Sequence, residues 1–289
     1  MSLRRFVAVV LLGALAACSA PESKSDGIVQ VVTTFSTLNS FVQAVGGAHV
    51  HVQNLVPIGA SPEDYQPTPQ DIGTLSQAQL LVENGSGIEA WLQHTIADAG
   101  NATMKKLVLS DGLPRKGLNP HLWMDPQLAK RYVDKIAGAL SSVDEAHAKD
   151  YTVNAARYKA RLDALSSDIQ KQINTIPPNH RTMIVFHNAW QYYNDRFGLR
   201  TVGVIELSPG QEPNPEYIGH LVDLARREHV RAIFAEPEYS PKLVQTLASS
   251  AHIKTVENLY DDSVAGKGAV SDYISMLQYD TKTIVQALR

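Results

Sequence analysis

Four loops, far apart in the sequence, each contain one side chain that can bind a metal ion. These side chains are Glu63, His121, His187 and Glu257. Imidazole nitrogens and carboxylate oxygens are common ligands of zinc, manganese and iron. None of the loops supplies enough ligands alone, but residues that follow different strands can converge at the carboxyl edges of packed sheets. The pattern predicts one divalent cation held between two lobes.

The first part of the chain alternates between strands and helices. Residues 28–34, 49–57 and 78–83 have the apolar or β-branched character of strands, and helical spacing occupies residues 38–45 and 69–75. Such alternation is typical of βαβ units with a largely parallel sheet. We therefore expect a small α/β lobe over residues 28–122.

The middle of the chain contains no strand signal. Apolar residues keep a helical period from Tyr151 to Ile173, until the Pro177-Pro178 pair ends it. Strand signals then return at residues 182–186, 201–205, 230–235 and 253–256. The predicted fold class is α/β: two lobes with parallel sheets joined by one long backbone helix. The helical segment covers residues 123–176, with the long helix from about Val143 to Ile176, and the second lobe covers residues 177–289.

The N-terminus has the pattern of a bacterial lipoprotein signal. Two arginines precede a short apolar run, and Leu15-Ala16-Ala17-Cys18 fits a lipobox. We expect a signal peptide over residues 1–17, lipid attachment at Cys18, a polar tether over residues 18–27, and an extracytoplasmic protein anchored to membrane lipid. Cys18 is the only cysteine, which excludes an intrachain disulfide and a thiolate metal site. A net charge of −3 gives no reason to expect nucleic-acid binding.

Several longer motifs carry a resemblance to a known family. They are the proline-bracketed loop at residues 59–69, Asn-Pro-His-Leu-Trp-Met-Asp-Pro at 119–126, Phe-His-Asn-Ala-Trp at 186–190, and Ala-Glu-Pro-Glu-Tyr-Ser-Pro-Lys at 235–242. Together they resemble the zinc and manganese substrate-binding proteins (cluster A-I) of bacterial ABC importers. The resemblance implies a monomeric receptor with a helical backbone, not an enzyme. It also implies one transported divalent ion (zinc, manganese or iron) and an ABC permease in the cytoplasmic membrane as partner.

The resemblance also implies how the first three loops are used. His121 corresponds to the second metal ligand of the family, and His187 to the third, where the family has His or Glu. Glu63 departs from the pattern, because the family usually has His there. A carboxylate still binds these metals and makes the site harder. Asp64 is the next candidate in that loop and otherwise supports it without touching the metal.

The fourth ligand is less clearly marked. Val256-Glu257-Asn258-Leu259 aligns with the segment that carries an aspartate ligand in the family, which points to Glu257, with Asp261 and Asp262 as alternatives. Glu236, which ends a predicted strand, is expected to support a liganding histidine. Two imidazoles with two carboxylates suit zinc at four-coordination and manganese or iron at higher coordination. The zinc-specific members often have a His- and acid-rich insertion before the second ligand, and its absence favours manganese or general divalent uptake.

Two other functions are compatible with parts of this pattern. A zinc-dependent hydrolase needs two histidines, a carboxylate and a nearby glutamate base, but the chain lacks His-Glu-x-x-His. An adhesin-like surface lipoprotein would need an exposed partner surface, which sequence does not reveal.

Overall fold

The computed structural model describes residues 27–208 and 210–289. The predicted signal peptide, Cys18 and the tether up to residue 26 lie outside the described residues. Four strands form the first sheet: β1 (Val29–Thr33), β2 (Val50–Asn54), β3 (Leu80–Glu83) and β4 (Lys105–Val108). The strands are parallel and lie in the order β2-β1-β3-β4. The carboxyl ends of all four strands therefore lie at one edge.

The helices of the first lobe are α1 (Ser36–Gly46), α2 (Pro69–Ser76) and α3 (Leu92–Ala99). α2 begins with a capping box, in which Thr68 and Asp71 bond to each other's backbone N–H, and with a proline at its first turn. These signals fix where the loop that contains Glu63 ends.

The second sheet repeats the design of the first. It contains β5 (Thr182–Val185), β6 (Arg200–Val204), β7 (Ala232–Phe234) and β8 (Lys254–Val256), parallel and in the order β6-β5-β7-β8. The accompanying helices are α6 (Gln191–Phe197), α7 (Pro215–Arg227) and α8 (Pro241–Ala251).

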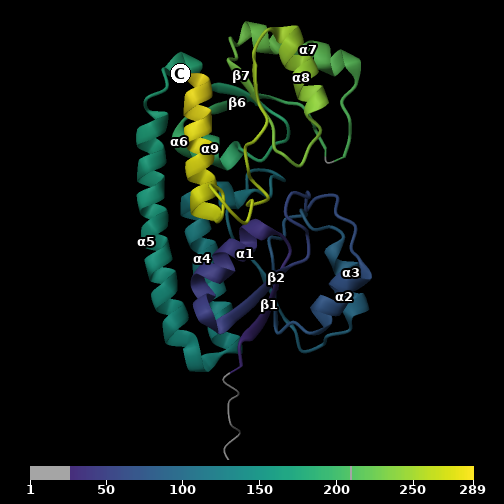
Figure 1. The fold of residues 1–289 in the computed structure, drawn as a ribbon, viewed down its shortest axis with the longest axis vertical. Helices are drawn as coiled ribbons and strands as arrows, with labels where there is room; N and C mark the ends of the chain where they lie inside the picture. The colour runs from purple at the N-terminus through teal and green to yellow at the C-terminus, as the bar shows by residue number, and fades with distance from the viewer. Residues whose placement is uncertain (1–26, 209) are drawn as a thin grey trace, which may run out of the picture.

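A long helix runs beside both lobes. α5 (Ala148–Ile173) has 26 residues, about 39 Å at 1.5 Å per residue, and extends from the first lobe to the second in Figure 1. It begins five residues later than expected, because α4 (Pro126–Val143) ends at Asp144 and a short turn, η3 (Glu145–His147), intervenes. α4 and α9 (Tyr273–Leu288) pack along α5. None of the described helices is long and apolar enough to cross a membrane.

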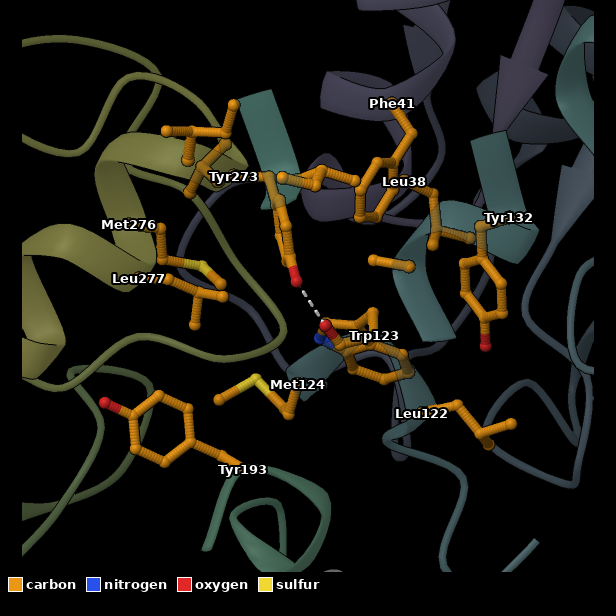
Figure 2. Close-up of a cluster of buried hydrophobic side chains, with 14 of the residues drawn as sticks. Leu38, Phe41, Leu122, Trp123, Met124, Tyr132, Tyr193, Tyr273, Met276 and Leu277 are labelled. Carbon is orange, nitrogen blue, oxygen red and sulfur yellow. Dashed lines mark hydrogen bonds between the residues drawn. The ribbon is translucent and has the colours of Figure 1, made fainter. Parts of the chain in front are cut away.

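One hydrophobic core extends through both lobes and includes side chains from β1, α4, α5, α6 and α9. Trp123 lies within it in η2 (Leu122–Met124), two residues after His121. Figure 2 shows the hydroxyl of Tyr273 from α9 donating to the Trp123 carbonyl, at 2.5 Å. Phe35 also packs on Trp123, with ring centroids 5.2 Å apart. The segment around His121 is therefore held by buried contacts on several sides.

Candidate metal centre

The two predicted histidines meet between the sheets. His121 follows the loop after β4, and His187 lies two residues beyond β5. Their Nε2 atoms are 3.3 Å apart, and both side chains are buried. Two imidazole nitrogens at this distance can hold one proton between them or share a metal ion.

The charges around the two rings differ. Burial and the neighbouring His187 hold the pKa of His121 well below its usual range. Burial also lowers the pKa of His187, but Asp261 and Glu236 outweigh it and raise that pKa well above its usual range. These opposite shifts favour a proton on His187 over one on His121, and a metal ion that binds both Nε2 atoms needs both rings neutral.

Carboxylates surround the paired nitrogens. Glu63 Oε1 lies 3.8 Å and Asp262 Oδ1 3.6 Å from His121 Nε2. Asp261 Oδ2 lies 3.5 Å from His187 Nε2. Ligand atoms about 2.1 Å from a tetrahedral metal are about 3.4 Å apart, which is close to these separations. His121, His187 and Asp262 place one ligand atom each within 4.8 Å of one another, as do His187, Glu236 and Asp261.

The aspartate oxygens that face the histidines lack hydrogen bonds. Among the described residues, Asp261 Oδ2 and Asp262 Oδ1 have no hydrogen-bond partner, although both side chains are almost fully buried. Burial raises the pKa of both carboxyls well above the usual range, and His187 opposes the rise. Buried carboxylate oxygens of this kind are stable as anions when a cation binds them.

The loop of Glu63 is fixed by the first lobe. The indole N–H of Trp91 donates to the carbonyl of Pro62 at 2.8 Å, and the backbone N–H of Glu63 donates to Ser61 Oγ at 3.2 Å. Burial raises the pKa of Glu63. His187 lowers the pKa of Glu63, and the charge of the exposed Asp64 raises it by a smaller amount. Asp64 thus acts on the centre through its charge.

Glu236 faces His187, the contact expected of a residue that supports a liganding histidine. Its Oε1 accepts a hydrogen bond from Trp190 Nε1 at 3.1 Å, and its Oε2 lies 3.5 Å from His187 Nδ1. Glu236 therefore lies beside Nδ1 of His187, whereas Nε2 of the same ring faces His121. A carboxylate there orients the ring and stabilises the tautomer whose Nε2 lone pair is free for metal.

Asn119 is a residue that sequence reasoning left without a role. Its side-chain oxygen accepts hydrogen bonds from the backbone N–H and from Nδ1 of His121, both at 3.0 Å. Its amide nitrogen donates to the carbonyl of Asn188, beside His187, at 2.6 Å. Because Nδ1 carries the proton, Nε2 of His121 has a free lone pair. In the sequence, the only indication of this role was the position of Asn119 two residues before His121.

Two more carboxylates surround the centre and were not predicted. Glu206 follows β6, and its charge interacts with those of His187 and Glu63. Burial, reinforced by Glu236, raises the pKa of Glu238 to about 7. A concentration of acidic groups lowers the electrostatic potential and attracts cations from solution.

The structure does not bring Glu257 to the histidines. Its Oε1 accepts a hydrogen bond from Gln245 Nε2 at 2.9 Å, and its side chain lines a surface cavity with Lys254 and Tyr279. Asp261 and Asp262, the two alternatives to Glu257, lie beside the histidines instead. The chain runs along the second lobe after β8 and reaches the histidines only at Asp261 and Asp262.

Contacts with η2 and α1 determine the path of this segment. Trp123 Nε1 donates to the carbonyl of Asp261 at 2.9 Å, and Thr37 Oγ1 donates to the carbonyl of Asp262 at 2.8 Å. Both bonds join residues far apart in sequence. Alignment of a short motif after β8 could not reveal them.

Residues 31–287 match the family described as "Zinc-uptake complex component A periplasmic". The chain belongs to this family. It is 31% identical to the manganese-binding lipoprotein MntA of Halalkalibacterium halodurans over 291 residues, which cover 98% of this chain and 97% of the relative. The iron-binding protein YfeA of Yersinia pestis is 30% identical over 266 residues, or 89% and 85% of the two chains.

A solved structure extends the comparison to the fold. A crystal structure of ZnuA superimposes with a TM-score of 0.82 at 27% identity, covering 90% of this chain and 99% of that one. The predicted resemblance to this family and the predicted fold class, two α/β lobes with parallel sheets, are both confirmed.

Proposed function

We propose that the protein is an extracytoplasmic receptor that binds one divalent transition-metal ion and delivers it to an ABC permease. The observation that carries the proposal is the meeting of His121 and His187 from opposite sheets, with unpartnered buried carboxylates around them. The names of its relatives, manganese-binding, iron-binding and metal ABC transporter substrate-binding, support the same role.

The proposed ligands are Glu63 Oε1, His121 Nε2, His187 Nε2 and Asp262 Oδ1. Two neutral imidazoles and two carboxylates neutralise a divalent cation, so the loaded centre carries no net charge from these groups. Glu236 holds the ring of His187, and Asn119 holds that of His121. Because the ligands come from both lobes, separation of the lobes would divide the ligand set and release the ion.

A harder ligand set favours harder metals. Glu63 replaces the histidine that the family usually has, so oxygen replaces nitrogen at one position. We therefore propose manganese or iron as the cargo in preference to zinc. The relatives named for manganese and iron agree with this choice.

The location and partners follow from the same role. We propose a monomer attached to membrane lipid through Cys18, outside the cytoplasm, where the permease can receive the ion. The alternative of a zinc-dependent hydrolase is less well supported, because His121 and Asp262 are almost fully buried and leave no exposed coordination position for a substrate. No particular feature of the described residues favours an adhesin.

Metal titration of the purified protein tests the proposal. We expect one equivalent of Mn²⁺ or Zn²⁺ to bind, and the double variant His121→Ala with His187→Ala to lose this binding. His94→Ala is the matched control, because His94 is exposed on α3. Absence of tight binding to the unaltered protein, or unchanged binding in the double variant, would refute the proposed function.

A further inference from the structure

Asn84 follows β3 directly and contacts the segment that contains His121, although its own loop supplies no proposed ligand. Its side chain is completely buried. Its amide nitrogen donates to the carbonyl of Pro120 at 3.1 Å and to the carbonyl of Gly85 at 3.0 Å. Its side-chain oxygen accepts a hydrogen bond from the hydroxyl of Tyr132 in α4. Both amide hydrogens and the amide oxygen are therefore used.

We propose that Asn84, together with the Tyr132 hydroxyl, is a positioning residue that directs the imidazole of His121 toward the metal. The inference rests on the proposed function. The peptide between Pro120 and His121 is held at both of its polar atoms. Asn84 donates to its carbonyl, and the side-chain oxygen of Asn119 accepts its N–H at 3.0 Å. A peptide plane fixed on both sides leaves the backbone of His121 little freedom to turn, so Nε2 keeps one direction.

The surrounding groups allow one orientation of the Asn84 amide. The carbonyls of Pro120 and Gly85 both need a donor, and the Tyr132 hydroxyl supplies a donor to the amide oxygen. The reverse orientation would place the amide oxygen against two buried carbonyl oxygens, which is unfavourable. The ring of Tyr132 lies in the hydrophobic core, with its centroid 6.1 Å from that of Phe41 (Figure 2). The hydroxyl is therefore held in place by packing.

The backbone of Asn84 is fixed by a buried carboxylate, that of Glu89. Oε1 of Glu89 accepts the backbone N–H of Asn84 at 2.7 Å and the hydroxyl of Thr34 at 2.8 Å. Oε2 accepts the backbone N–H of Gly85 at 2.9 Å. Gly85 has a φ of +78°, and a Cβ there would lie 2.4 Å from a methyl group of Val108, so the turn requires glycine. The ends of β1 and β3 are joined around Glu89, and this turn fixes the point from which the Asn84 side chain starts.

Asn101 provides a matched control in the same lobe. Its amide nitrogen also donates to backbone carbonyls, those of Leu75, Ser76 and Ala78, at 2.9–3.1 Å. These contacts lie at the amino ends of β3 and β4, whereas Asn84 lies at the carboxyl end of β3. Asn101→Ala therefore removes an asparagine that holds several carbonyls but lies at the edge of the sheet opposite the histidines.

The test compares Mn²⁺ titrations of Asn84→Ala, Tyr132→Phe and Asn101→Ala with those of the unaltered protein. We expect Asn84→Ala to weaken Mn²⁺ binding by about tenfold or more and Tyr132→Phe, which keeps the ring, by about fivefold. Asn101→Ala should lose stability in urea but keep its Mn²⁺ affinity within about twofold. Mn²⁺ affinity within about twofold of the unaltered protein in Asn84→Ala or in Tyr132→Phe would overturn the inference. So would an equal weakening in Asn101→Ala, because loss of stability alone would then explain the effect.

The visible absorption of Co²⁺-loaded protein gives a second reading, because it depends on which atoms bind the ion and in what geometry. At saturating Co²⁺, we expect an altered spectrum in Tyr132→Phe and an unaltered one in Asn101→Ala. An unaltered spectrum in Tyr132→Phe would overturn the inference even if Asn84→Ala does not fold. Failure of the unaltered protein to bind Mn²⁺ or Co²⁺ would instead refute the proposed function, so the two failures are distinguishable.

Discussion

Asn119 connects the loops of the two histidines, so its replacement tests whether the histidines act as a pair. Asn119→Ala removes two hydrogen bonds to His121 and one to the carbonyl of Asn188. His121 Nδ1 then loses its acceptor in a buried position. The imidazole becomes free to rotate or to change tautomer, and Nε2 no longer points consistently at the metal.

The size of the effect follows from these contacts. Loss of a partner that orients a liganding histidine typically costs about 10-fold to 100-fold in metal affinity, which corresponds to about 1.4–2.8 kcal/mol. Each buried neutral hydrogen bond contributes about 1 kcal/mol to folding, so three of them amount to about 3 kcal/mol of stability in the absence of metal. We expect both losses in Asn119→Ala.

Two further variants separate the contributions. Asn119→Asp keeps the oxygen that binds His121 but places a second oxygen against the Asn188 carbonyl, so it should lose stability while losing less metal affinity than Asn119→Ala. Asn188→Ala is the matched control, since only its backbone carbonyl takes part and its side chain is exposed. Calorimetric titration and urea unfolding measure the two quantities. Metal affinity of Asn119→Ala within about twofold of the unaltered protein would refute the reasoning.

Three other substitutions have distinct expected outcomes. In competition titrations, Glu63→His should raise the Zn²⁺/Mn²⁺ affinity ratio by about tenfold, and Glu63→Ala should weaken the binding of both metals by more than about tenfold. Unchanged affinities in both variants would show that Glu63 does not bind the metal. Glu257→Gln should alter metal affinity by less than about twofold, because the Glu257 carboxylate accepts a hydrogen bond from Gln245 away from the histidines. A large loss of affinity would contradict this position of Glu257. Gly46→Ala places a Cβ 2.3 Å from a Val50 methyl and should lower stability in urea by about 2 kcal/mol, whereas a neutral result would contradict the packing of α1 against β2.

Local patterns were sufficient to predict the fold and the histidine pair. The strands are short apolar runs, and the helical period from Tyr151 to Ile173 lies entirely within α5. Parallel strands bring the residues after β5, such as His187, to one edge of a sheet, so position in sequence predicts position in space. Glu63 and His121 are placed by loops rich in proline, whose restricted backbone limits the available paths.

The positions of the remaining proposed ligands depend on contacts between residues far apart in the sequence. The segment after β8 has no periodicity. Hydrogen bonds from Trp123 in η2 and Thr37 in α1 decide that Asp261 and Asp262 reach the histidines. Glu257 aligned with the family motif, but its carboxylate bonds to Gln245 away from the histidines. Asn119 was visible in a motif, but its bond to the carbonyl of Asn188 joins two lobes and could be found only in the folded chain.

The location of a bound ion tests the central claim most directly. Crystals of the protein loaded with Mn²⁺, measured with X-rays at the manganese absorption edge, give an anomalous difference map that identifies the metal. We predict one strong peak between the lobes, about 2.0–2.3 Å from His121 Nε2, His187 Nε2 and oxygens of Glu63 and Asp262. A peak at Glu257, or a protein loaded with Mn²⁺ in solution but without a peak between the two histidines, would contradict the claim.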